Sequence, residues 1–171
     1  MNVKVLYVSA KYRDPRGTWY IKKNIQIAEE IAVELWQMGF AVICPHSNTA
    51  FFEGPINDPI IIAGDCELVK RSDGVVVGPN WFTSEGTRIE WKTGFDNKKP
   101  IFFWEKPRDV EALKAWAKDA YDLKAHLDRQ ASLPTIEAMW AGVRLDEEKE
   151  EGSGPIGAGQ ARLRESCKCA L

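Results

Sequence analysis

Glu90 stands six residues after Ser84, and this spacing suits a ligand-binding helix. Ser84 is a helix-start signal, and it follows an apolar run that ends at Gly78-Pro79. In open α/β sheets, ligands bind beyond the carboxyl ends of strands, beside helix N-termini. Six residues of helix rise about 9 Å, comparable with the reach from a nucleotide's phosphate to the far side of its sugar. The segment could therefore hold an anion at its tip and direct Glu90 at a group bound behind it.

The surroundings of Glu90 bear on whether it is a reactive carboxylate or a solvated one. A helical side chain leans toward the helix N-terminus, over the residue one turn earlier. For Glu90 that residue is Gly86, which has no side chain to fill the space. Its chain neighbours, Ile89 and Trp91, are apolar. These features favour a functional role, whereas position alone favours a glutamate on a solvated helix face.

Asp65, in the segment Gly64-Asp65-Cys66, is the second candidate carboxylate. One interpretation is structural, because a carboxylate near a helix start interacts favourably with the helix dipole. The other is chemical, because two carboxylates in different environments can divide the roles of nucleophile and acid. The chemical interpretation requires the fold to bring Asp65 beside Glu90.

The start of the helix that carries Glu90 is the expected anion site. Ser84 can cap this helix and also bind a phosphate, and the two roles are compatible. The backbone amides of Gly86 and Thr87 would point at the same anion. Arg13 follows the first predicted strand and would reach the same edge of the sheet, although a solvated surface arginine is the alternative.

His46 and Tyr7 complete the set of candidate binding residues. His46 follows the second predicted strand, again at the carboxyl edge, where it could contact a ligand or satisfy a loop hydrogen bond. Tyr7 lies within the first predicted strand and could point into the site or into the core.

Apolar runs alternate with helical periodicity along the chain. Short apolar runs predict strands, and apolar residues that recur at intervals of three and four predict helices. Expected strands cover 3–9, 40–44, 73–78 and 101–104, and expected helices cover 18–38, 60–71, 85–97, 109–129 and 135–141. A strand, a helix and a strand within about 45 residues form a βαβ unit with parallel strands. We therefore expect an α/β protein with a doubly wound, flavodoxin/Rossmann-like parallel sheet of four to five strands.

Composition narrows the class of protein. The chain has 171 residues, 44% of them hydrophobic, and a net charge of −2, which argues against an electrostatic nucleic-acid binder. No apolar run reaches the length of a membrane span, and the N-terminus lacks a secretion signal. The four cysteines lack zinc spacing, so we expect a cytoplasmic protein with reduced thiols, no metal and no cofactor. Residues 1–145 form the expected domain, and residues 146–171 an acidic, glycine-rich disordered tail.

Several segments together resemble the nucleoside 2-deoxyribosyltransferase superfamily, and most closely its nucleotide N-glycosidase branch and the uncharacterised, phage-type relatives of that branch. They follow in order between about residues 3 and 104: Val5-Leu6-Tyr7-Val8-Ser9 with Tyr12-Arg13, Asn24-Ile25 with Leu35-Trp36-Gln37-Met38-Gly39, Cys44-Pro45-His46-Ser47-Asn48-Thr49, Gly64-Asp65, Ser72-Asp73, and Ser84-Glu85-Gly86-Thr87-Arg88-Ile89-Glu90. The chain departs from the family at Ser9-Ala10-Lys11, where a glycine-rich turn is usual, and at Trp91-Lys92, where a small residue usually follows the glutamate.

The resemblance implies an enzyme that cleaves the bond between base and sugar in a (deoxy)nucleoside 5′-monophosphate. It implies that Glu90 attacks the sugar, that Asp65 handles the proton of the departing base, and that a serine at position 84 recognises a 5′-phosphate. It also implies a homodimer. Two alternatives stay open: a transferase that moves the sugar between bases, and a non-catalytic nucleotide-binding module, which the Trp91-Lys92 departure motivates.

Overall fold

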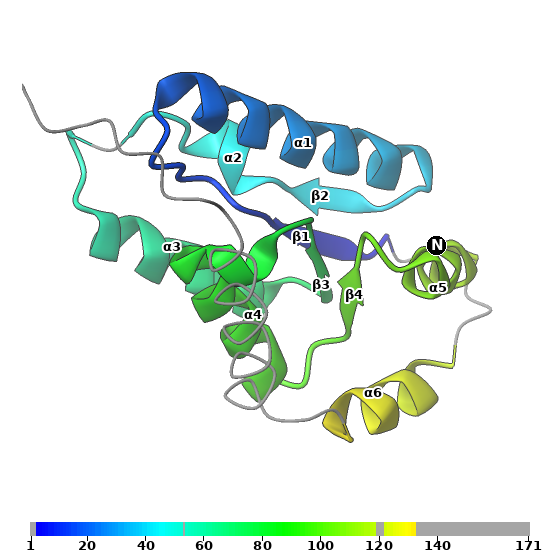
Figure 1. Cartoon of the computed structure of the whole chain (residues 1–171). Helices are drawn as coiled ribbons and strands as arrows, with labels where there is room; N and C mark the ends of the chain where they lie inside the picture. The colour runs from blue at the N-terminus through cyan, green and yellow to red at the C-terminus, as the bar shows by residue number, and fades with distance from the viewer. Residues whose placement is uncertain (1–2, 53, 119–121, 133–171) are drawn as a thin grey trace, which may run out of the picture. The chain divides into compact units, whose positions relative to one another are not determined.

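The computed structural model describes residues 3–52, 54–118 and 122–132, and within them strands alternate with helices (Figure 1). In chain order the elements are β1 (Val5–Ser9), α1 (Thr18–Gln37), β2 (Ala41–Ile43), α2 (Pro45–Asn48), α3 (Asp58–Arg71), β3 (Gly74–Val77), the 3-10 turn η1 (Trp81–Thr83), α4 (Glu85–Asp96), β4 (Ile101–Phe103), α5 (Pro107–Ala117) and α6 (Leu123–Ala131).

The four strands form one parallel sheet in the order β2-β1-β3-β4. Helices flank both faces: α1 and α5 pack on one, and α3 and α4 on the other. This arrangement confirms the predicted doubly wound, Rossmann-like α/β fold, with four strands. Because α1 follows β1 and α4 follows β3, two neighbouring strands send their helices to opposite faces. Such a switch point is where open α/β sheets bind ligands.

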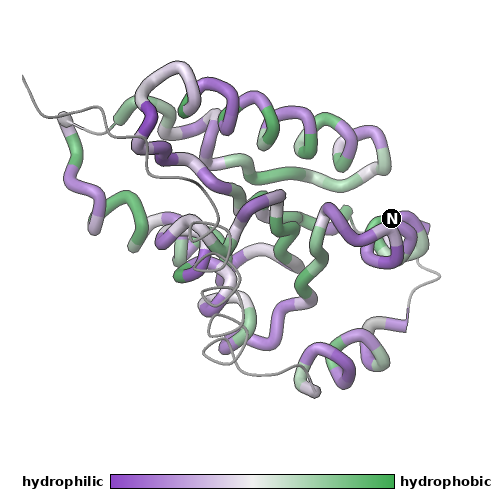
Figure 2. The backbone as a smooth tube through the Cα atoms, viewed as in Figure 1, coloured by the Kyte–Doolittle hydropathy of each residue, from purple (hydrophilic) through white to green (hydrophobic). Residues whose placement is uncertain are grey.

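Helix α1 shows why one face of the sheet is apolar. Its buried residues recur at helical spacing and point at the sheet: Ile25, Ala28, Ile31, Ala32 and Leu35. Figure 2 shows polar and apolar residues alternating along this helix. Gly39 follows with φ of 98°, a conformation that glycine adopts without the steric cost borne by other residues, so the chain turns sharply into β2.

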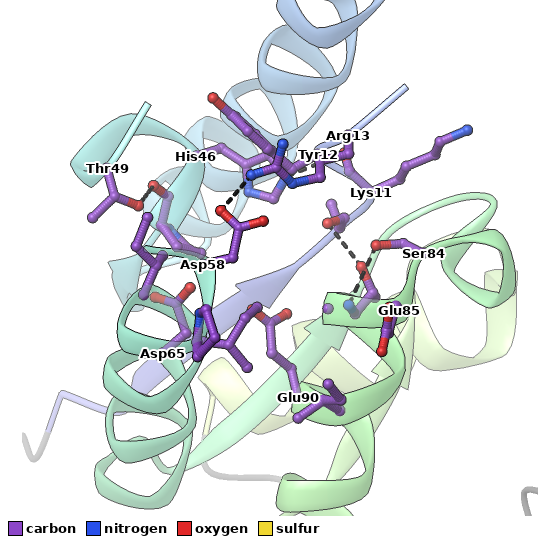
Figure 3. A pocket seen from close by; sticks show the side chains of 18 of the residues that line it. Lys11, Tyr12, Arg13, His46, Thr49, Asp58, Asp65, Ser84, Glu85 and Glu90 are labelled. Atoms are coloured by element: carbon purple, nitrogen blue, oxygen red, sulfur yellow. Dashed lines mark hydrogen bonds and ion pairs between the residues drawn. The ribbon is translucent and has the colours of Figure 1, made fainter. Parts of the chain in front are cut away.

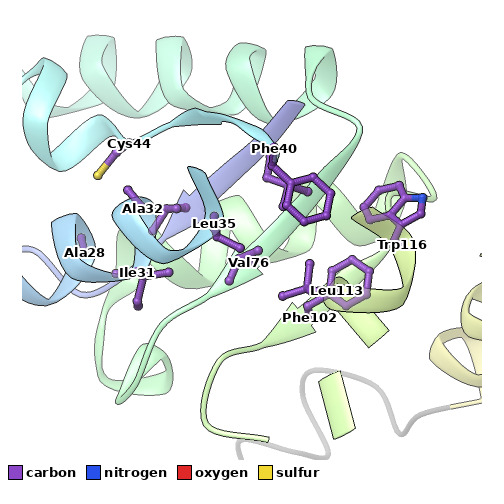
Figure 4. Packing of buried hydrophobic residues seen from close by; sticks show 13 residues of the cluster. Ala28, Ile31, Ala32, Leu35, Phe40, Cys44, Val76, Phe102, Leu113 and Trp116 are labelled. Carbon is purple, nitrogen blue, oxygen red and sulfur yellow. The ribbon is translucent and has the colours of Figure 1, made fainter. Parts of the chain in front are cut away.

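The hydrophobic core lies between α1, the sheet and α5 (Figure 4). Leu35 from α1, Val76 from β3 and Phe102 from β4 meet there, and α5 adds Leu113 and Trp116. Phe102 and Trp116 pack with ring centroids 5.5 Å apart. This core fixes the sheet from one side and leaves the other face for α3 and α4.

The predicted single helix over residues 109–129 is wrong, because the structure has two helices, α5 and α6. Helix α5 ends at Ala117, and the Asp122 carboxylate starts α6 by accepting a hydrogen bond from the Ala125 amide (2.9 Å). An aspartate that caps a new helix cannot also sit in the middle of a continuous one. Sequence periodicity alone does not separate the two, because both helices keep apolar residues at helical intervals.

The other predicted elements among the described residues are confirmed to within two residues at their ends. The segment between the second predicted strand and the helix expected from residue 60 contains the short helix α2, which begins with Pro45 at its first position. The predicted helix over 135–141 and the tail over 146–171 lie outside the described residues. Within the described part of the chain, no helix is long and apolar enough to cross a membrane.

Candidate functional site

A pocket of about 720 Å³ lies at the switch point of the sheet. Its walls come from the loop after β1, from α2, from α3 and from the first turns of α4 (Figure 3). Seven of the eight predicted site residues line it: Arg13, His46, Asp65, Ser84, Gly86, Thr87 and Glu90. Tyr7, the eighth, is fully buried behind Glu90. The fold therefore brings together residues that are up to 83 positions apart in the chain.

Glu90 is buried, with 5% of its surface exposed, so the solvated-glutamate alternative is wrong. Helix α4 buries Thr87, Glu90, Trp91 and Gly94, a spacing that turns Glu90 toward the sheet. Both carboxylate oxygens accept hydrogen bonds from β1. The Tyr7 hydroxyl donates to Oε1 (2.8 Å) and the Ser9 hydroxyl donates to Oε2 (2.5 Å). Glu90 is thus held by two donors while it faces the pocket.

Gly86 keeps space open between α3 and α4 in front of Glu90. A Cβ atom at this position would lie 3.1 Å from Ile62 Cδ1. A larger residue would therefore press on α3 at the wall of the pocket. The glycine at position 86 therefore lets α4 approach Ile62 of α3.

Asp65 reaches the same pocket from α3, the helix that faces α4 (Figure 3). It is the eighth residue of α3, beyond the first turn, so the interpretation as a helix-dipole residue is wrong. The first-turn carboxylate is Asp58 instead. Asp65 is buried, and burial raises the pKa of its carboxyl group to about 6.

The two carboxyl groups influence each other. Burial raises the pKa of Glu90 to about 8, and the negative charge of Asp65 adds to the rise, while the hydrogen bonds from Ser9 and Tyr7 oppose it. Between pH values of about 6 and about 8 the pair therefore holds one proton in total. With these pKa values the proton lies on Glu90 and Asp65 is the anion, so a reaction in which Glu90 attacks and Asp65 donates a proton starts from the less populated arrangement, with the proton on Asp65.

The start of α4 is capped as predicted. Ser84 Oγ accepts a hydrogen bond from the Thr87 amide (3.3 Å), and the Thr87 hydroxyl donates to the Ala10 carbonyl (2.9 Å). Thr87 thus ties α4 to the loop after β1, and both its amide and its hydroxyl are already used. Helix geometry leaves the amides of Glu85 and Gly86 for an anion. These two amides and the Ser84 hydroxyl lie at one end of the pocket, at a helix N-terminus, which is a position that favours an anion.

Arg13 and Asp58 form an ion pair at the pocket (2.5 Å), and each side chain is about half exposed. An exposed pair of this kind contributes little stability, so a stronger anion can compete for the arginine. Lys11 pairs with the buried Asp14 (3.3 Å), which also accepts two hydrogen bonds from the Arg16 guanidinium. Arg13 is therefore the cation of the pocket whose partner is easiest to exchange.

His46 lies in α2 and is 5% exposed. Its Nε2 is 3.2 Å from the Lys11 carbonyl, and a carbonyl only accepts, so Nε2 carries the hydrogen. Burial lowers the pKa of His46, which keeps the ring neutral. Nδ1 is buried and has no hydrogen-bond partner. A neutral His46 therefore keeps one buried acceptor, Nδ1, that none of the described residues uses.

Ser9 is the functional residue that sequence reasoning missed. Successive residues of a strand point to opposite faces, so Tyr7 and Ser9 share a face of β1. Once Tyr7 is placed beside Glu90, the alternation predicts that Ser9 lies there too. The signal was present in the sequence, but it becomes readable only when the partner helix is known.

Trp91 and Lys92, the departure from the family pattern, do not line the pocket. Trp91 is buried and stacks on Trp81 and Phe95, with ring centroids 6.0 and 5.2 Å away. Lys92 is exposed and pairs with Asp96 (2.6 Å). The departure therefore adds packing and a surface ion pair and leaves the space in front of Glu90 open.

Among the described residues, no group of three or more histidine, cysteine, aspartate or glutamate side chains could hold a metal ion. No protein-family model matches the chain. No curated protein matches it either. The resemblance described above therefore rests on the quoted residues alone.

Proposed function

We propose that this protein is an N-glycosidase that cleaves the bond between base and sugar in a (deoxy)nucleoside 5′-monophosphate. The observation that carries the proposal is the pair of buried carboxyl groups, Asp65 and Glu90, in a pocket that also contains the start of α4. Burying a carboxylate lowers the stability of the folded protein, and such buried, pocket-facing carboxyl groups are typical of functional sites.

The substrate orientation follows from the two ends of the pocket. The 5′-phosphate binds at the Ser84 hydroxyl and the amides of Glu85 and Gly86, where the helix dipole favours an anion. Arg13 exchanges Asp58 for the phosphate. The sugar then lies along the first turns of α4, with its anomeric carbon in front of Glu90. The base occupies the space toward Asp65.

The proposed reaction has two steps. The first step starts from the arrangement in which the pair's one proton lies on Asp65 and Glu90 is ionised. An oxygen of Glu90 forms a bond to the anomeric carbon while the bond to the base breaks, and Asp65 gives its proton to the leaving base. In the second, ionised Asp65 takes a proton from water, whose oxygen attacks the anomeric carbon and releases Glu90 as a carboxylate. The sugar keeps its configuration because it is inverted twice. No cofactor is required.

The test is a panel of ribo- and deoxynucleoside monophosphates, with freed base measured by chromatography. We expect at least one to release base, and Glu90→Gln, which keeps the size of the side chain, to abolish release while nucleotide binding measured by calorimetry persists. Near-normal turnover by Glu90→Gln would overturn the mechanism. Tight binding without release from any member of the panel would favour the non-catalytic module.

A transferase is the second candidate, since the same glycosyl–enzyme ester can pass its sugar to a base instead of to water. The observation in its favour is the size of the pocket, about 720 Å³, which leaves room beside a bound sugar. Adding a free base of a different kind and looking for exchanged nucleotide separates the two. An exchanged product that forms faster than free sugar phosphate would identify a transferase.

We further propose that the protein assembles as a homodimer, as the family resemblance implies. Light scattering at micromolar concentration is expected to give twice the chain mass of 19.3 kDa. A mass of one chain would refute the assembly and leave the mechanism untouched, because every residue invoked above comes from a single chain.

A further inference from the structure

Ser9 is a fully buried hydroxyl that does not line the pocket and still touches the candidate nucleophile. It is the last residue of β1, and its Oγ lies 2.5 Å from Glu90 Oε2. Its neighbour in the register, Val77 of β3, is apolar. The contact with Glu90 is therefore the feature that explains a hydroxyl at this otherwise apolar position.

The two hydroxyl donors from β1 bind different oxygens of the Glu90 carboxylate. An ionised carboxylate offers about four acceptor positions, two on each oxygen. Tyr7 takes one on Oε1 and Ser9 takes one on Oε2, so one on each oxygen remains. Two hydrogen bonds to two different oxygens fix the plane of the group, which a single bond to Oε1 would leave free to rotate.

We propose that Ser9 is a positioning residue for Glu90, whose hydroxyl fixes the plane of the carboxylate and stabilises the ionised form. For the attack on the sugar this inference rests on the proposed function, but the effect on ionisation belongs to the protein alone. Ser9 does not touch the substrate. It acts through Glu90.

Among the described residues, the groups that interact with Glu90 come from β1 and α3. Tyr7 and Ser9 approach from β1, and Asp65 approaches from α3. Cys66, the next residue of α3, lies close enough to Tyr7 to contribute to the raised pKa of that phenol, which is due first to burial. Burial and Asp65 oppose ionisation of Glu90, and the hydrogen bond from Ser9 outweighs that from Tyr7 in favouring it. Removing Ser9 therefore removes the main support of the anion.

The direct test is a titration of Glu90 by carbon-13 NMR of labelled glutamate carboxyls, with the signal assigned by its loss in Glu90→Gln. A hydrogen bond to a charged group is strong enough that Ser9→Ala should raise the pKa of Glu90 by about one to two units. Ser9→Thr keeps the hydroxyl and should restore the wild-type value. Ser72→Ala is the matched control, because Ser72 is equally buried and its hydroxyl donates to the Val69 carbonyl (2.8 Å), away from Glu90.

Kinetics supply the second readout. With a monophosphate that the wild-type protein cleaves, Ser9→Ala should move the acidic limb of the pH–rate profile upward by the same one to two units and lower kcat at neutral pH by about tenfold or more. The Michaelis constant should stay unchanged, because the phosphate contacts are intact. A purely structural role for Ser9 would lower both stability and rate without moving the limb.

The inference is overturned if Ser9→Ala leaves the pKa of Glu90 unchanged, or if Ser72→Ala shifts it equally. Both results come from the protein without substrate. If no nucleotide releases base from the wild-type protein, the proposed function fails and the titration still decides the role of Ser9. Should Ser9→Ala fail to fold, Ser9→Cys, which replaces the hydroxyl by a weaker donor, is expected to give a smaller upward shift of the pKa.

Discussion

The two faces of strand β1 carry opposite kinds of buried side chain. Leu6 and Val8 pack into the apolar core under α1 and α5. Tyr7 and Ser9, which alternate with them, form hydrogen bonds to Glu90 of α4. Tyr7, Ser9 and the two core residues are all without solvent exposure. One strand thus separates a region that stabilises the fold from a region that holds a carboxylate out of water.

The difference between the two faces of β1 shows where the protein tolerates the unfavourable burial of polar groups. Apolar burial stabilises the folded state at roughly 25 cal/mol for each Å² removed from water. Burial of a carboxyl group is unfavourable unless hydrogen bonds or protonation compensate it. Glu90 and Asp65 are both buried, and both have raised pKa values. The polar face therefore carries the unfavourable burial of carboxyl groups, and substitutions on the two faces should have different consequences.

The largest expected effect is on catalysis from the polar face. Asp65→Asn keeps the shape of the side chain and removes the proton that the leaving base needs, so base release should fall by about 10² to 10⁴-fold. A substrate with an activated leaving group, which departs without protonation, should show a burst of release followed by slow turnover. The slow phase is the hydrolysis of the glycosyl ester, because asparagine cannot take a proton from the attacking water as Asp65 does. Equal losses with both substrates and no burst would contradict the assigned role.

The next expected effect is a difference in the free energy of unfolding between substitutions on the two faces of β1. Leu6→Ala, on the apolar face, should lower the free energy of unfolding by about 2 to 5 kcal/mol, because it leaves a cavity in a fully buried core. Tyr7→Phe, on the polar face, removes only a hydroxyl and should cost about 1 kcal/mol. When the variants are compared at equal folded fraction, Tyr7→Phe should reduce the rate of base release more than Leu6→Ala does. Denaturant unfolding measures the first comparison. Equal destabilisation by the two substitutions would remove the distinction between the faces.

The positions of the strands and of the helix carrying Glu90 could be read from the sequence, because apolar periodicity and the Ser84 cap are local signals. The break between α5 and α6 could not, since Asp122 fits a helix interior and a helix start equally well by spacing. The site was predictable only in part for a related reason. Asp65 and Glu90 could be named, but the burial that raises their pKa values depends on how α3 packs against α4.

Residues that meet across elements were the least predictable. Arg13 was expected at a phosphate, and the structure pairs it with Asp58, which is 45 positions away. The amide of Thr87 was expected to bind the anion, and it is used by Ser84. Asp58 lies outside the local patterns that sequence reasoning uses, whereas the Ser84 cap is a local pattern that already accounts for the Thr87 amide. The sequence does indicate which residues of a strand share a face. Because Tyr7 and Ser9 share a face of β1, Ser9 is expected beside Glu90 once Tyr7 is known to contact it.

A smaller effect concerns the pH dependence of stability. Because the pKa of Glu90 rises from an ordinary 4.5 to about 8 on folding, the folded state binds its proton more tightly than the unfolded state. This stability is fully present below pH 4.5 and is lost as the pH rises toward 8, with a slope of at most about 1.4 kcal/mol per pH unit. Asp65 adds a similar loss that is complete by pH 6 or so.

Glu90→Gln should remove the part of this loss that lies between about pH 6 and pH 8, where Glu90 alone still releases its proton. Unfolding by urea across this interval measures it. Leu6→Ala is the control from the apolar face, and it should lower stability at every pH without changing the slope. A wild-type protein whose stability is flat across the interval would show that Glu90 is already ionised at its lower end.

The smallest expected effect is at Ser84, which has a structural and a functional role at the same atom. Ser84→Ala removes the cap of α4 and should cost about 1 kcal/mol of stability. It should also raise the Michaelis constant for monophosphates by about tenfold and scarcely affect nucleosides, because the lost contact is to the phosphate. Ser84→Asp separates the two roles, since aspartate caps a helix as well as serine but repels a phosphate. This variant should keep wild-type stability and lose monophosphate cleavage more severely than Ser84→Ala. If Ser84→Asp cleaves monophosphates as well as the wild-type protein, the start of α4 does not hold the phosphate, and the orientation of the substrate in the pocket must be reversed.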